Sequence, residues 1–184
     1  PYVVVSGTQE KVEIDFTDYG DESDPGPYPF PANAPVEGAG APGDMHVIAV
    51  DKDNCKLYET FNSVYIGPGW TASSGAVFDL RSDALRPDYW TSADAAGLPI
   101  FAGLVRYSEV AAGAINHAIR VTFNNVQKGF IHPATHEVGS SNTNYPPMGL
   151  RLRLKASFDI SGFNPTAQVI LTAFKRSGLF VADI

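Results

Sequence analysis

Apolar and polar side chains alternate without a break through Leu150-Arg151-Leu152-Arg153-Leu154-Lys155-Ala156-Ser157-Phe158. Successive side chains of a strand point to opposite faces, so the leucines share one face and the three basic residues share the other. This pattern is typical of an antiparallel sheet that packs one face on a core and leaves the other in water. The stretch therefore predicts an antiparallel β-sheet protein.

The composition of the whole chain supports this interpretation. The chain has 184 residues, of which 44% are hydrophobic, and it contains 17 Gly and 14 Pro. Its length fits one domain with a real core, and this much Pro and Gly favours short strands and turns over a helical bundle. Further stretches with strand character lie at 2–5, 12–16, 46–50, 55–61, 75–80, 115–123 and 179–182. We expect a single all-β domain with minor α content, an antiparallel β-sandwich of the jelly-roll or concanavalin-like type over 1–184.

Two segments depart from the strand pattern. Residues 18–43 are rich in Pro and Gly, which cannot continue a sheet ladder, so we expect them to form a surface arm. Near the other end, Asn164 is a cap, Pro165 suits the first helical position and Gly178 suits the end. The sequence therefore predicts one C-terminal helix at about 165–177.

The arm also contains a glycine pattern that occurs in nucleotide-binding loops. Gly38-Ala-Gly-Ala-Pro-Gly43 matches G-x-G-x-x-G. Pro42 and the strand expected after it remove the helix N-terminus that a pyrophosphate would need. We therefore predict no nucleotide site there.

The charge of the chain limits its partners. The net charge is -7, with a balance of -9 over 1–59 and +2 over the remainder, which opposes nucleic-acid binding by the whole molecule. No stretch of about 18 apolar residues occurs, so we expect no membrane-spanning helix. Cys55 is the single cysteine and excludes an intrachain disulfide.

The cations of the alternating stretch have two interpretations. Arg151, Arg153 and Lys155 could line a groove that binds carboxylate or sulfate groups of an acidic polymer. They could equally neutralise the acidic N-terminal part of the chain. Trp70 and Trp90, in or beside loops, are either platforms for sugar rings or anchors that bury loops.

A carboxylate and a histidine stand out on neighbouring predicted strands. By strand parity, Glu59 lies on the same face as Leu57 and Phe61, where desolvation raises the pKa of a carboxyl as a general acid requires. The alternative is that Glu59 pairs with a buried arginine. His46 is expected opposite Glu59, so the two could exchange protons at one site.

Two further histidines lie four residues apart and could bind a metal. His132 and His136 would share a face of an extended segment, since Pro133 excludes a helix there. They would need a third ligand such as His46 or Asp51. The alternative is that both are surface or hydrogen-bonding side chains. The sequence predicts no cofactor other than this possible metal ion.

Five motifs carry a resemblance to other proteins. They are Asp24-Pro-Gly-Pro-Tyr-Pro, Gly43-Asp-Met-His46, the segment 51–59, Ser92-Ala-Asp-Ala-Ala-Gly-Leu-Pro99 and Arg151-Leu-Arg-Leu-Lys155. In these motifs the chain resembles a group of uncharacterised secreted bacterial and environmental proteins that often accompany carbohydrate-related modules. The resemblance implies an extracellular, polysaccharide-associated role and identifies no catalytic residue. The pattern of that group continues beyond 181–183, so we expect Ile184 to be a point of truncation.

Two functions follow from these observations. The first is a secreted polysaccharide-active enzyme, a hydrolase or lyase that cleaves glycosidic bonds, in which Glu59 and His46 transfer protons and Arg151 and Arg153 position the substrate. The second is a non-catalytic extracellular module. It would bind glycans through Trp70 and Trp90, or self-assemble as a homo-oligomer, surface layer or filament.

Overall fold

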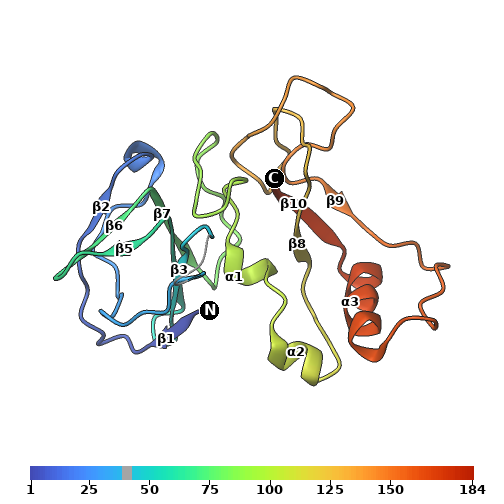
Figure 1. Ribbon diagram of the computed structural model, residues 1–184, viewed down its shortest axis with the longest axis horizontal. Helices are drawn as coiled ribbons and strands as arrows, with labels where there is room; N and C mark the ends of the chain where they lie inside the picture. Colours follow the sequence, from blue (N-terminus) through green and yellow to red (C-terminus); the bar gives the residue numbers. More distant parts are fainter. Residues whose placement is uncertain (39–42) are drawn as a thin grey trace.

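The computed structural model describes residues 1–38 and 43–184 and contains three small sheets (Figure 1). The first sheet has the strand order β1-β3-β4-β7, and β1 runs parallel to β3 while the other pairs are antiparallel. Its strands are β1 (Val3–Val5), β3 (Val47–Asp51), β4 (Lys56–Phe61) and β7 (Ser74–Asp79). The stretches with strand character at 46–50 and 55–61 thus pair as a hairpin.

The second sheet packs beside the first in the N-terminal half. Its order is β2-β6-β5, with β2 (Ile14–Phe16) parallel to β6 (Trp70–Ala72) and β5 (Val64–Tyr65) antiparallel to β6. The N-terminal core lies between these strands and includes Tyr28 and Phe30, which are fully buried. The Pro- and Gly-rich segment therefore contributes aromatic side chains to the core. The glycine pattern at 38–43 lies partly outside the described residues.

The third sheet belongs to the C-terminal half. In it β10 (Leu179–Asp183) lies between β8 (Ile119–Thr122), to which it is parallel, and β9 (Arg151–Leu152), to which it is antiparallel. The helix α3 (Pro165–Arg176) connects β9 to β10 and buries Ala173 in a cluster with Ile115 and Ile119. In Figure 1 this unit lies opposite the two N-terminal sheets, with the segment around α1 between them.

Four short helical segments complete the fold. They are the 3-10 helix η1 (Gly20–Glu22), α1 (Ile100–Gly103), α2 (Tyr107–Ala111) and α3. The helix expected at about 165–177 is present as α3: Asn164 Oδ1 accepts the backbone N–H of Ala167 at 2.9 Å, and Gly178 follows with a φ of 83°. None of the helices in the described ranges combines the length and the apolar character needed to cross a bilayer.

The predicted all-β antiparallel sandwich is wrong. The fold is mixed α/β, and each of its three small sheets contains a parallel pair: β1 with β3, β2 with β6, and β8 with β10. Alternation indicates which face of a strand a side chain occupies, but it indicates neither the neighbouring strand nor the direction of that strand. The fold prediction was wrong because strand pairing joins residues that are far apart in the sequence.

The alternating stretch at 150–158 shows the same limit. Its basic side chains are exposed and Leu152 and Leu154 are half-buried, as the alternation predicts, but only Arg151–Leu152 pairs as the strand β9. Beyond Leu152, the stretch follows the end of α3, where Arg153 Nη2 donates to the carbonyls of Lys175 and Arg176. The partner of this segment is a helix terminus.

We predict that Gly149→Ala destabilises the protein far more than Gly113→Ala. Both glycines have a positive φ, 78° and 79°, so each variant incurs about 1–2 kcal/mol of left-handed strain. Only at Gly149 would the new Cβ clash, at 1.9 Å from the Ile131 carbonyl oxygen, which adds about 1–3 kcal/mol. Urea unfolding of the two variants measures the difference. Equal losses would contradict the close approach of the chain at Gly149.

Candidate functional site

Glu59 lies at the centre of β4 and is fully buried. Its Oε1 accepts the backbone N–H of Phe101 at 2.7 Å, and its Oε2 accepts that of Ile100 at 2.8 Å. The carboxylate thus occupies the N-terminus of α1, where unpaired N–H groups need acceptors. Burial raises the pKa of Glu59 to about 7, although these two hydrogen bonds act in the opposite direction. The burial of Glu59 agrees with the face that strand parity predicts, but its hydrogen-bond partners are backbone groups.

A second buried carboxylate, Asp94, lies in the segment before α1. Its Oδ2 accepts from Nε and Nη2 of Arg120 at 2.9 and 2.7 Å, and its Oδ1 accepts the N–H of Ala96 at 2.8 Å. The same guanidinium reaches Asp183 on β10 at 3.3 Å. Burial raises the pKa of Asp94 to about 6, against the opposing charge of Arg120. This network joins the central segment to the third sheet.

The pair Asp94–Arg120 separates two cavities. Arg120 lines a cavity of about 660 Å³ whose walls are mostly apolar, whereas Asp94 lines a cavity of about 200 Å³ that we call the histidine pocket. The histidine pocket is lined by Tyr19, Asp44, His46, Phe61, Ser74, Thr91, Ser92, Ala93, Asp94, Ala95, His136, Val138, Asp183 and Ile184. Two imidazoles and three carboxylates meet there, so it is the better candidate for chemistry.

His46 is held firmly at the edge of this pocket. Its Nδ1 lies 3.2 Å from the carbonyl oxygen of Thr60, and its ring packs against Phe61 with centroids 5.7 Å apart. A carbonyl only accepts hydrogen bonds, so Nδ1 carries the proton and Nε2 keeps its lone pair in the neutral ring. Within the described ranges, no hydrogen bond joins His46 to Glu59, although both side chains lie on the same face of the first sheet.

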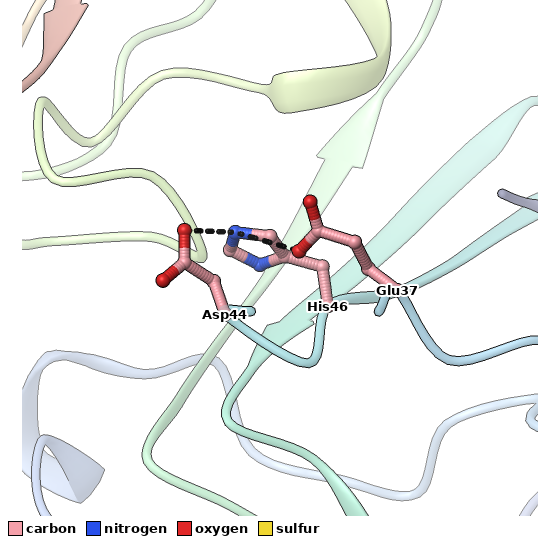
Figure 2. A group of neighbouring side chains, drawn as sticks. All are labelled: Glu37, Asp44 and His46. Atoms are coloured by element: carbon pink, nitrogen blue, oxygen red, sulfur yellow. Dashed lines mark ion pairs between the residues drawn. The ribbon is translucent and has the colours of Figure 1, made fainter. Parts of the chain in front are cut away.

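Two carboxylates gather around the free nitrogen of His46 (Figure 2). Nε2 lies 3.8 Å from Asp44 Oδ2 and 4.0 Å from Glu37 Oε2. One ligand atom from each of the three residues lies within 4.8 Å of the other two, so they form a group that could hold a metal ion. Neither His132 nor His136 belongs to this group.

His136 is held in the same way on another wall of the pocket. Its Nδ1 lies 2.9 Å from the carbonyl oxygen of Ala95, which again places the ring proton on Nδ1. Its Nε2 lies 3.7 Å from Glu22 Oε2, an oxygen that also accepts the N–H of Thr91 at 3.0 Å. His136 therefore has a single carboxylate neighbour, in contrast to His46.

His132 does not join His136. It is exposed, and its Nε2 contacts Asp88 Oδ1 at 2.7 Å outside the histidine pocket. The spacing argument assumed an extended strand, but His132 and Pro133 form a turn, so side chains four apart no longer share a face. The pair expected from the sequence thus separates, and His136 lies in one cavity with His46 instead.

The basic residues of the alternating stretch lie at the C-terminal end of α3. Arg151 donates from Nε and Nη2 to the carbonyl of Ser177 at 3.1 and 2.5 Å, and its guanidinium lies over the ring of Phe180. Arg153 bonds the preceding carbonyls, while Lys155 is exposed. Cations at a helix C-terminus satisfy unpaired carbonyls and the helix dipole. This contact differs from both interpretations of the stretch, as a polymer groove and as a counter-charge for the N-terminal part.

The two tryptophans also lie apart from the histidine pocket. Trp70 is only 2% exposed and packs in the N-terminal core with Phe30, which leaves no ring face for a sugar. Trp90 is half-buried and its ring lies 5.6 Å from the guanidinium carbon of Arg86. Both therefore anchor chain segments.

Sequence reasoning missed most of the polar groups of the site. Glu22, Glu37, Asp44, Asp94 and Arg120 were not singled out as site residues. Asp44 and Asp94 stand in motifs of the resemblance, which identified no functional residue, and the other three have no local motif. The sequence did contain one indication that Asp44 belongs to a site: it stands two residues before His46, and both residues lie near the start of a strand. The remaining groups meet only through the fold.

We predict that Glu59 makes the protein less stable as the pH rises from about 4.5 to 7. Its pKa is raised from 4.5 to about 7, so the folded protein keeps a proton that the unfolded chain has released in that window. The free energy of unfolding then falls with pH, by on the order of 3 kcal/mol from this group. Asp94 acts in the same direction between 3.8 and about 6.

Urea unfolding at about pH 5 and pH 7 checks this prediction. The wild-type protein should lose more stability between the two pH values than Glu59→Gln, whose amide does not titrate. Equal losses in the two proteins would contradict the raised pKa of Glu59.

No protein-family model, curated protein or solved structure matches the chain.

Proposed function

We propose that the chain hydrolyses glycosidic bonds of an extracellular polysaccharide in the histidine pocket. The observation that carries this proposal is the convergence of His46 and His136 on one cavity, each with Nδ1 held by a backbone carbonyl. Imidazoles fixed in this way present Nε2 for proton transfer or for binding. The polymer class comes from the resemblance noted in the sequence, and two of its motifs, 43–46 and 92–99, contribute residues to the pocket.

His136 is the proposed proton donor. Glu22 Oε2 lies 3.7 Å from its Nε2, so a proton on Nε2 would have a carboxylate neighbour. In the hydrolysis, His136 gives its proton to the bridging oxygen as the bond from that oxygen to the anomeric carbon breaks. A water molecule on the His46 side forms the new bond to the anomeric carbon, and Asp44 accepts the proton that the water releases. The wall that carries His136 and the wall that carries His46 would thus both take part in the reaction.

The charge of the pocket favours a neutral polymer. Asp44, Asp94 and Asp183 line it, and among the described lining residues there is no lysine or arginine. A uronic acid polymer would bring further negative charge beside these carboxylates. Arg151 and Arg153, the cations expected to position an anionic polymer, bond the end of α3 instead. Hydrolysis of a neutral glycan therefore fits better than lyase chemistry.

Glu59 acts as a positioning residue in this proposal. Both of its oxygens accept backbone N–H groups, and it lines neither of the two cavities separated by Arg120. Its carboxylate fixes the start of α1, which follows directly on the segment that carries Asp94. We infer that it holds this wall of the pocket and does not exchange protons with the substrate.

A second candidate function is ligand binding without turnover. The larger cavity has about 660 Å³, the size of a small-molecule site, and apolar residues such as Leu98 and Phe180 line much of it. Its charged lining residues are of both signs: Asp24, Asp79, Asp83, Lys56, Arg86 and Arg120. An amphipathic ligand suits this lining. This candidate is a non-catalytic module whose ligand site differs from the Trp70 and Trp90 platforms expected from the sequence.

The proposed hydrolysis predicts a large rate loss in His136→Gln. Removal of a proton-transfer group lowers kcat by about 10²- to 10⁴-fold, and KM should change little. Release of reducing ends from a panel of neutral polysaccharides measures the rate.

His117→Gln is the matched control for this experiment. His117 also has its Nδ1 near a backbone carbonyl, that of Ala118, and a carboxylate partner, Glu109, at 3.1 Å, but it lies outside the histidine pocket. It should keep wild-type turnover. Full activity in His136→Gln would overturn the proposed role, and binding without turnover by the wild-type chain would favour the second candidate.

A further inference from the structure

The three side chains shown in Figure 2 form a group of potential metal ligands at the edge of the histidine pocket. Asp44 and His46 line that pocket, and Glu37 lies beside them. We propose that Glu37, Asp44 and His46 bind a divalent first-row metal ion such as Zn²⁺ or Mn²⁺. This group was not expected from the sequence, which pointed to His132 and His136.

The backbone places all three ligands before any ion is bound. Val36 forms an antiparallel bridge with Val47, and the N–H of Glu37 donates to the carbonyl of His46 at 2.9 Å. Across the other side, the N–H of Asn62 donates to the carbonyl of Asp44 at 2.9 Å. The ligands therefore stand on an extension of the sheet. A site held by such contacts needs little reorganisation to bind an ion.

The imidazole is oriented as metal-binding histidines are. Such a residue usually donates its second ring N–H to a carbonyl or carboxylate, which fixes the tautomer and frees the other nitrogen for the ion. His46 makes this contact to Thr60, and its side chain is only 12% exposed. Its Nε2 thus lies near Asp44 and Glu37, and the contact of Nδ1 with Thr60 leaves the lone pair of Nε2 available in the neutral ring.

Negative charge predominates around Nε2 of His46. Glu37 Oε2 is shielded from solvent and accepts no hydrogen bond from the described residues, although 43% of the side chain is exposed. In the ranges that the structure describes, no lysine or arginine nitrogen lies within 4.0 Å of Glu37 or Asp44. Two carboxylates converge on one imidazole, so a bound cation would supply the missing positive charge.

The geometry and the ligand types point to the kind of ion. The three ligand atoms lie within 4.8 Å of one another, and rotations of the exposed Asp44 and the half-buried Glu37 side chains would bring their oxygens to the roughly 2.0–2.2 Å of zinc sites. Imidazole suits Zn²⁺ and similar ions better than Ca²⁺ or Mg²⁺, which prefer oxygen. Three protein ligands leave a position for water.

Such an ion would extend the proposed hydrolysis. A bound divalent ion would lower the pKa of the water expected on the His46 side of the pocket, and Asp44 would then act as a ligand of the ion and not as the sole group that activates this water. This role in turnover rests on the proposed function, whereas binding of the ion does not. The two can therefore be tested separately.

Isothermal titration with ZnCl₂ and with MnCl₂ tests the site on chelator-treated, dialysed protein. We expect saturable binding of about one ion per chain, with Zn²⁺ or Mn²⁺ preferred over Ca²⁺. Glu37→Gln and Asp44→Asn should each weaken the affinity by at least about tenfold, since even outer-shell partners are worth about 10- to 100-fold. His117→Gln should bind as the wild type does. Both ligand substitutions are isosteric, and thermal unfolding verifies that the variants fold.

Three results would overturn the site. They are no saturable binding of Zn²⁺ or Mn²⁺, unchanged affinity in both Glu37→Gln and Asp44→Asn, or an equal loss in His117→Gln. Binding that follows the prediction in a chain that cleaves no polysaccharide would keep the metal site and overturn the proposed hydrolysis. Hydrolysis that persists after chelation, with no metal binding, would do the reverse.

Discussion

Two buried carboxylates hold the halves of this protein together. Glu59, on the first sheet, accepts the N–H groups that begin α1, and Asp94 accepts the guanidinium of Arg120 on the third sheet. A buried carboxylate is costly unless donors meet it, so each one specifies which segment must lie beside it. The third sheet is tied further through Asp183, which contacts the same Arg120. The relative placement of the sheets depends on these contacts.

The histidine pocket is a consequence of this arrangement. Its walls come from the N-terminal arm, the approach to β3, the end of β4 and start of β7, the segment around Asp94, the segment of His136 and Val138, and the end of β10. Asp94 faces the pocket while its partner Arg120 faces the larger cavity, so one ion pair shapes both spaces. Within the described residues, no hydrogen bond joins this ion pair to either imidazole, so the pair acts on the pocket through its shape and charge.

The basic stretch shows how local and distant contacts divide their roles. Alternation placed Arg151 and Arg153 on the exposed side correctly. Their partners are carbonyls at the end of α3 that lie more than twenty residues later in the chain. The positive charges of this stretch are therefore explained by their contacts with the end of α3. Binding and chemistry are proposed elsewhere, in the histidine pocket with its three carboxylates.

Local patterns in the sequence determined the local structure. The hairpin of β3 and β4, the burial of Glu59, and α3 with its cap at Asn164 all follow from residues within a few positions of each other. Tertiary structure alone decided the parallel pairs, the separation of His132 from His136, and the meeting of His136 with His46 and of Glu37 with Asp44. The physical reason is range: periodicity and capping act along one segment, whereas pairing and burial depend on which distant segments come together.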